Sequence, residues 1–164
     1  MKNPSVLTAV FRRLVLAVLC GALSAGAAEV TIAHVFTGWR EAASFKRISE
    51  YFNGKENTGG QQVIRTHPEV RAGYYFLLRT GNPGAALPVR INLELISATG
   101  PKSRTFTFAA DLAAGDTVLN LGLTGEDWPD PKANPVAWKI DLVTGDGRVL
   151  AMEKSYLWEK PVAP

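Results

Sequence analysis

Apolar and polar residues alternate with a period of two along most of the chain. Residues 89–97 show this pattern most clearly. The apolar positions there are Val89, Ile91, Leu93 and Leu95, and the polar positions between them are Arg90, Asn92 and Glu94. Successive side chains of a β-strand point to opposite faces, so this alternation predicts a strand with one buried face.

A second alternating run is followed by a turn and a returning run, which predicts a β-hairpin. In residues 135–143 the apolar face holds Val136, Trp138, Ile140 and Leu142. Gly145, Asp146 and Gly147 then supply residues that tolerate the positive φ angles of a tight turn, and residues 149–158 return. Five further segments have strand character: residues 30–36, 61–66, 73–79, 103–110 and 117–123.

Eight strands joined by short Gly-, Pro-, Asn- and Asp-rich turns predict an all-β fold, an antiparallel sandwich of about seven to nine strands. The strand count and alternation resemble the broad class of immunoglobulin-like bacterial sandwiches, a class that hosts many functions and transfers no residue roles. We expect three parts: a secretory signal at residues 1–28, a single sandwich domain at 29–160, and a flexible tail at 161–164.

Residues 41–53 depart from the alternation and favour a short helix. Ala42, Phe45, Ile48 and Phe52 recur at intervals of three and four residues, and Gly54 stands where a helix would end. An alternating strand also fits this segment. Both faces of residues 73–79 are apolar, because Tyr75 and Leu77 lie opposite the core set. We expect residues 41–53 to cover them.

The N-terminus predicts export. Lys2, Arg12 and Arg13 precede an apolar run at residues 14–23, and small residues follow at 24–28. A cleaved signal would place the protein in the periplasm or outside the cell. Lipid attachment at Cys20 is disfavoured, because a leucine stands before it instead of a small residue.

Without residues 1–28 the chain is neutral. The full chain has 18 basic and 15 acidic residues, and loss of three basic ones leaves 15 of each sign. Nucleic acid is therefore a poor candidate partner, because non-specific binding to it depends on basic charge. Cys20 is the only cysteine, so the domain after the signal has no disulfide.

No residue cluster predicts a cofactor or a transition-metal site. His34 shares the strand parity of Val30, Ile32 and Phe36, so we expect it to be buried, and His67 precedes a proline in an exposed turn. The two histidines lack the clustered ligands that a transition-metal site needs. Nucleophile-elbow, phosphate-loop and dinucleotide-binding motifs do not occur in the sequence.

Residues 124–138 hold the strongest candidate site. Trp128 lies between acidic residues and prolines, so we place it in a loop at one end of the sandwich. There it either plugs the open end, which we favour, or contacts a ligand together with Asp127 and Asp130. A weaker alternative is a Ca²⁺ site. Its ligands would be Glu126, Asp127, Asp130 and Asn134.

Two functions from different classes remain. The preferred one is an exported, non-catalytic sandwich that acts as a binding, accessory or assembly module for a protein or glycan partner, with no cofactor. The alternative is a carbohydrate-active or other hydrolytic enzyme that uses loop carboxylates. A cleft with two carboxylates of raised pKa would favour the enzyme, and a flat aromatic patch would favour the module.

Overall fold

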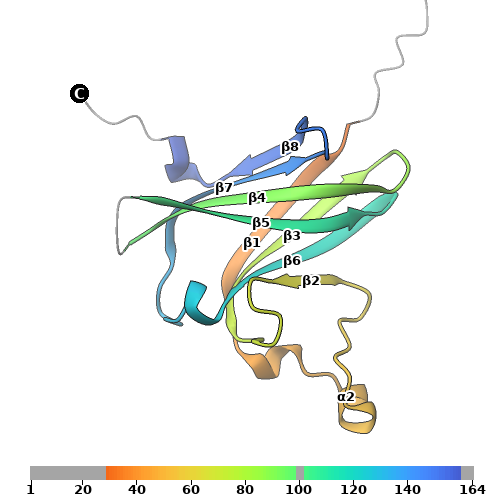
Figure 1. The fold of residues 1–164 in the computed structure, drawn as a ribbon, viewed down its shortest axis with the longest axis vertical. Coiled ribbons are helices and arrows are strands. Elements are labelled where there is room, and N and C mark those ends of the chain that lie inside the picture. The colour runs from red at the N-terminus through yellow and green to blue at the C-terminus, as the bar shows by residue number, and fades with distance from the viewer. Residues whose placement is uncertain (1–28, 99–101, 160–164) are drawn as a thin grey trace, which may run out of the picture.

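The computed structural model describes residues 29–98 and 102–159. The expected signal at 1–28 and the tail at 161–164 lie outside the described residues. Two four-stranded sheets stack face to face as a β-sandwich (Figure 1). The first sheet contains β1 (Thr31–Arg40), β3 (Gly73–Asn82), β6 (Gly115–Thr124) and β2 (Gln62–Arg65), in that order. The second contains β5 (Ser103–Leu112), β4 (Leu87–Ser97), β7 (Pro135–Val143) and β8 (Val149–Lys154).

The strand order is that of an immunoglobulin-like sandwich. Strands β1, β3 and β6 take the places of strands A, B and E, while β5, β4, β7 and β8 take those of C′, C, F and G. All neighbours in this frame are antiparallel. The sandwich predicted from the alternation is confirmed, and so is the hairpin of β7 and β8, whose turn contains Gly147 at a φ of 90°.

One strand pair differs from the antiparallel prediction. Strand β2 runs parallel to β6, with Val63 opposite Asn120. Parallel neighbours cannot be joined by a tight turn and need a long connection. Here that connection is residues 66–114, which contain β3, β4 and β5. Strand β2 itself lies in the excursion of residues 41–72, between the antiparallel neighbours β1 and β3. The excursion is the main addition to the immunoglobulin-like frame.

The core lies between the two sheets, and the alternation of β4 is confirmed there. The inward residues that are fully buried include Phe76, Leu78, Ile91, Leu93, Leu95, Leu119, Leu121, Leu123, Ile140 and Leu142. In strand β7 the prediction that Val136 lies on the buried face is wrong. Val136 is 45% exposed, because a bulge opposite Ile96 and Ser97 inserts it as an extra residue. Trp138 is half-buried and packs its ring edge-on against Phe76, with ring centroids 5.8 Å apart.

A bulge in β1 also overturns the prediction that His34 is buried. The register between β1 and β3 shifts between Ile32 and His34. One extra residue reverses the parity of everything that follows. His34 and Phe36 therefore lie on the outer face, whereas Ile32 still packs against the core. His67, expected to be exposed, is partly buried: 42% of its side-chain surface stays exposed, and its Nδ1 lies 2.7 Å from the carbonyl oxygen of Thr124.

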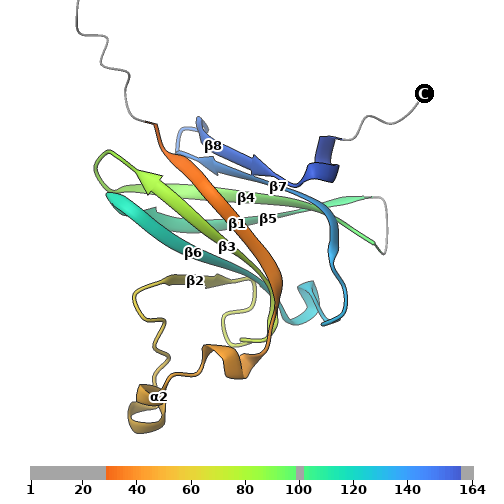
Figure 2. The same ribbon diagram turned by 180° about the vertical axis from the view of Figure 1, so that it is seen from behind.

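The helix expected at 41–53 forms as two short pieces. A 3₁₀ turn, η1 (Ala42–Phe45), and an α-helix, α2 (Ile48–Asn53), are separated by two residues in extended conformation. Gly54 ends α2 at a φ of 66°, as predicted. Figures 1 and 2 show α2 projecting away from the sandwich. The apolar residues assigned to one face are therefore split, and only Phe45 reaches the sheet, where its ring lies 4.7 Å from that of Tyr75.

Candidate binding groove beside Gly38

Tyr75 of β3 stands on the outer face of the first sheet between two glycines. Its cross-strand partners are Gly38 of β1 and Gly122 of β6. The ring leans toward β6, where a Cβ at position 122 would lie 2.5 Å from its Cε1 atom. A Cβ at position 38 would meet nothing within 4 Å. The lean of one aromatic ring thus leaves the surface above Gly38 open.

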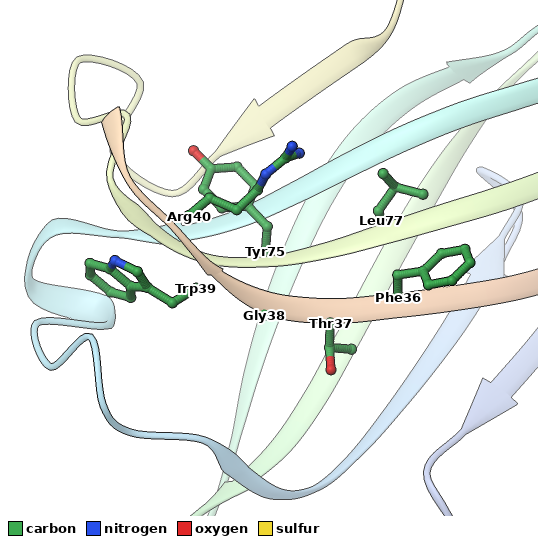
Figure 3. Close-up of a pocket in the computed structure, with 7 residues that line it drawn as sticks. All are labelled: Phe36, Thr37, Gly38, Trp39, Arg40, Tyr75 and Leu77. Atoms are coloured by element: carbon green, nitrogen blue, oxygen red, sulfur yellow. The ribbon is translucent and has the colours of Figure 1, made fainter. Parts of the chain in front are cut away.

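The open space is a shallow groove of about 270 Å³ along β1 and β3. Its walls come from Phe36, Leu77, Tyr75 and Arg40, which Figure 3 shows on one side of β1. Phe36 stands at one end of the groove with 51% of its surface exposed. Its ring packs against that of His34, with centroids 4.1 Å apart, and the other half of its surface is exposed beside the groove.

Each end of the groove pairs an aromatic ring with a guanidinium group. At one end, the guanidinium carbon of Arg79 lies 5.8 Å from the ring centroid of Phe36. At the other end, Arg40 lies 5.0 Å from the ring centroid of Phe45. Neither Arg40 nor Arg79 forms an ion pair within the part of the chain that the structure describes. Their charges are therefore available to a ligand.

A network of ion pairs behind Tyr75 fixes this end of the groove. Arg65 donates from Nε to the Tyr75 hydroxyl at 2.8 Å, and this hydroxyl donates to the Arg71 carbonyl oxygen at 2.7 Å. Arg65 also binds Glu56, and Arg71 binds Glu50 at 2.7 Å. These hydrogen bonds from arginine lower the pKa of both carboxyl groups, and burial raises the pKa of Tyr75. Tyr75 is thus held as a neutral, oriented phenol.

Sequence reasoning did not identify this groove, although one signal pointed to it. The apolar second face of β3, Tyr75 and Leu77, indicated that something covers this surface. Phe45 does cover Tyr75, as expected of residues 41–53, but the stretch over Gly38 stays open. The bulge in β1, which brings Phe36 to the same face, leaves no mark in the pattern of apolar residues.

The loop at residues 124–138, which the sequence favoured as a site, packs its tryptophan against the core. Trp128 follows the 3₁₀ turn η2 (Gly125–Asp127) and is 4% exposed, with its ring 5.1 Å from that of Tyr74. Its indole Nε1 donates to the Ala133 carbonyl oxygen at 3.3 Å. This arrangement is the plug at the end of the sandwich that we favoured. A ligand contact by Trp128, Asp127 and Asp130 stays a prediction, and it would require the indole to leave this packing.

The acidic side chains of the loop are turned to different partners. Asp127 accepts a hydrogen bond from Arg104 at 3.0 Å and lies 3.5 Å from Nδ1 of His67. Asp130 accepts from the backbone N–H of Lys132 at 2.8 Å, and Asn134 donates to the carbonyl oxygen of the same residue. Within residues 29–98 and 102–159, no three His, Cys, Asp or Glu side chains are grouped to hold a metal ion. The structure therefore does not bring Glu126, Asp127, Asp130 and Asn134 together around one point.

In the described ranges, no helix has both the length and the apolar character needed to cross a lipid bilayer. No known family model matches the chain, and no curated protein matches it either. Among solved structures, the chain is similar to an immunoglobulin-like protein from Pseudomonas aeruginosa, with 16% sequence identity and a TM-score of 0.33. The match covers 79% of this chain and 96% of that chain. A likeness of this degree transfers no residue roles.

Proposed function

We propose that the protein is an exported, non-catalytic binding module whose partner docks on the groove beside Gly38. The observation that carries this proposal is the exposed Phe36 next to an open groove, with an arginine near each end that packs over an aromatic ring and forms no ion pair within the described residues. Aromatic residues and arginine are enriched at protein interfaces, while lysine and acidic residues are depleted there. The composition of the groove supports a protein partner.

The geometry also favours a particular chemistry for that partner. Phe36 and Leu77 offer an apolar wall, and the space above Gly38 admits a side chain. Arg40 and Arg79 stand on either side of it and would pair with carboxylates. We therefore infer that the ligand is an extended protein segment with an apolar side chain flanked by acidic residues.

The alternative of a hydrolytic enzyme receives less support. A glycosidase of the usual type needs a carboxylic acid whose pKa is raised, so that it holds a proton at neutral pH. The carboxyl groups of Glu50, Glu56 and Asp146 shift in the opposite direction, each held ionised by a hydrogen bond. Glu50 and Glu56 also bind arginines that fix the connection to the sheet, which is a structural task.

Site-specific photo-cross-linking tests the groove by capturing the molecule that occupies it. A benzoylphenylalanine placed at Phe36 would be compared in the native cells with one placed at Val149, an exposed apolar residue of β8. A groove-filling variant, Gly38→Leu, provides the matched control. Gly38 has neither a positive φ nor a neighbour that a Cβ would meet, so a side chain fits there without strain in the fold.

We expect a discrete cross-linked species from position 36 that is absent from position 149 and is lost in the Gly38→Leu background. The urea denaturation curve of Gly38→Leu should match that of the parent. The proposal is wrong if position 36 gives no species of its own, or if filling the groove leaves its cross-linked species unchanged.

Export and a single domain at residues 29–160 belong to the same proposal. The described residues share one hydrophobic core cluster, which supports a single folding unit. Residues 1–28 supply the charged, apolar and small-residue regions of a secretory signal. N-terminal sequencing of protein recovered from the periplasm or medium should begin between Ala27 and Val30. Recovery of a chain that begins at Met1 would contradict export by a cleaved signal.

A further inference from the structure

Helix α2 presents its apolar side to solvent. Ile48, Tyr51 and Phe52 are spaced three and four residues apart, which places them on one face of a helix. They are 78%, 74% and 86% exposed. An amphipathic helix normally turns such a face toward the core. Figures 1 and 2 both show α2 at the end of the excursion farthest from the stacked sheets.

The polar side of α2 faces inward and holds the helix in this orientation. Glu50, the only charged residue that is buried in the described ranges, binds Arg71 at 2.7 Å. Its Oε1 also accepts from the backbone N–H groups of Arg47 and Asn57, at 3.4 and 3.2 Å. Rotation of the helix would break the ion pair with Arg71 and the hydrogen bond from Asn57. These contacts of Glu50 therefore keep the apolar face of α2 turned toward solvent.

The basic and acidic residues around this apolar face differ in whether they form ion pairs. Lys46 and Lys55 flank the helix, both are exposed, and neither forms an ion pair within residues 29–98 and 102–159. The acidic residues beside this face are both paired with arginines, the buried Glu50 with Arg71 and the exposed Glu56 with Arg65. Lys46 lies over the ring of Tyr51, with its Nζ 5.2 Å from the ring centroid. Beside the exposed apolar side chains, both lysines are therefore without an ion pair in the described residues, whereas both carboxylates are paired.

A recess of about 480 Å³ lies between η1 and α2, beside the tip of the excursion that α2 and its flanking Lys46 and Lys55 form. Its lining includes Lys46 and Tyr51, together with Glu50 and Arg71, whose charges are paired with one another. The recess gives a group next to the helix room to approach the lysine ammonium from the side. An anionic headgroup has the charge and the position to use it.

We propose that α2 is a docking point for an anionic lipid surface. A helix that lies in a membrane interface has apolar and aromatic residues on one side and Lys or Arg around them, and α2 has this arrangement. Tyrosine is favoured at the headgroup level, and lysine side chains reach the phosphates. A convex tip with three separate apolar side chains suits a deformable lipid surface better than a flat protein surface. One short helix gives weak, reversible binding that depends on the lysines.

A fluorescent label at the tip tests this directly in the full chain. Cys20→Ser removes the only native cysteine, and Phe52→Cys then carries a single nitrobenzoxadiazole label. The matched control carries the label at Tyr156→Cys, another exposed aromatic position. Each protein is mixed with phosphatidylcholine vesicles and with vesicles of phosphatidylcholine and phosphatidylglycerol. Each label reports its own surroundings, so the apolar run at 14–23, common to both proteins, does not create a difference between them.

We expect a blue shift of the label at position 52 with the anionic vesicles only, and none at position 156. Lys46→Glu with Lys55→Glu should weaken that response at least about tenfold, because each lysine contributes to attraction by an anionic surface. No shift with either vesicle type would overturn the proposal, as would an equal response to both. A shift that appears without lipid when the protein concentration is raised would overturn it in favour of a second copy.

Discussion

The ring of Tyr75 lies directly on Gly122 of the neighbouring strand. A Cβ at position 122 would stand 2.5 Å from Cε1 and 3.1 Å from the hydroxyl oxygen of this tyrosine. The glycine lets the ring lie over β6, where its hydroxyl reaches Arg65 and the backbone of Arg71. The same lean leaves the groove above Gly38 empty. One small residue on β6 thus shapes a groove on β1.

Gly122→Ala should destabilise the protein by about 1 to 3 kcal/mol, the usual cost of forcing an extra group into a packed site. The added methyl would push the Tyr75 ring off β6 and away from its hydrogen bonds. Urea denaturation gives the free energy of unfolding. The Gly38→Ala variant is the control on the opposite side of the same ring, and it should change stability by no more than about 0.5 kcal/mol. Equal effects at both positions would contradict this account of the groove.

Trp128→Ala should be more damaging than Trp138→Ala. Trp128 is 4% exposed inside the core cluster, so its loss should cost about 3 to 5 kcal/mol. Trp138 is half-buried beside a bulge, and its loss should cost about 1 to 3 kcal/mol. Equilibrium unfolding of the two variants gives the order. If Trp128→Ala retains the stability of the parent, the loop does not cap the sandwich, and its indole is free for a ligand.

The regular strands could be predicted from the sequence, and the bulges could not. Alternation in β4 identifies its buried residues, because both faces keep their parity over the whole strand. In β1 and β7 one extra residue reverses the parity, and this changed the outcome for His34 and Val136. A bulge is set by the register against the neighbouring strand, which a single segment of sequence does not contain.

The groove was missed for a related reason. It depends on Gly38 and Gly122 lying on either side of Tyr75, a relation between residues on three strands. The orientation of α2 could not be predicted either. Its apolar spacing predicts a helix, but it does not reveal that an ion pair between Glu50 and Arg71 holds the polar side of this helix inward. Periodicity identifies the apolar face of a helix, but it does not show whether that face contacts the core or lies exposed to solvent.

A chelator should leave the melting temperature of the protein unchanged. A bound Ca²⁺ ion would stabilise the folded state, and its removal would lower the melting temperature. Asp127 already binds Arg104 and lies beside His67, and Asp130 binds the backbone of its own loop. Thermal denaturation with and without EDTA checks this expectation. A decrease with EDTA that added Ca²⁺ reverses would show that Glu126, Asp127, Asp130 and Asn134 rearrange around an ion.

Glu50→Gln should destabilise the protein near neutral pH and much less in acid. The hydrogen bond from Arg71 holds the pKa of Glu50 below its ordinary value of 4.5. A carboxyl group with a lowered pKa in the folded state contributes stability above its unfolded pKa, and this contribution is lost as the pH falls through the folded value. The difference between the urea midpoints of parent and variant should therefore be largest above pH 4.5 and shrink below it.

The matched control for this titration is Glu69→Gln, which changes an exposed carboxyl group on the connection between β2 and β3. Its urea midpoint should follow that of the parent at every pH. A gap between Glu50→Gln and the parent that stays constant with pH would mean that Glu50 acts through its shape and not its charge. Because the same carboxylate turns the apolar face of α2 outward, Glu50→Gln should also make residues 48–53 more sensitive to limited proteolysis at neutral pH. Cleavage confined to that segment would show that the ion pair holds the tip, while the sandwich beneath it stays folded.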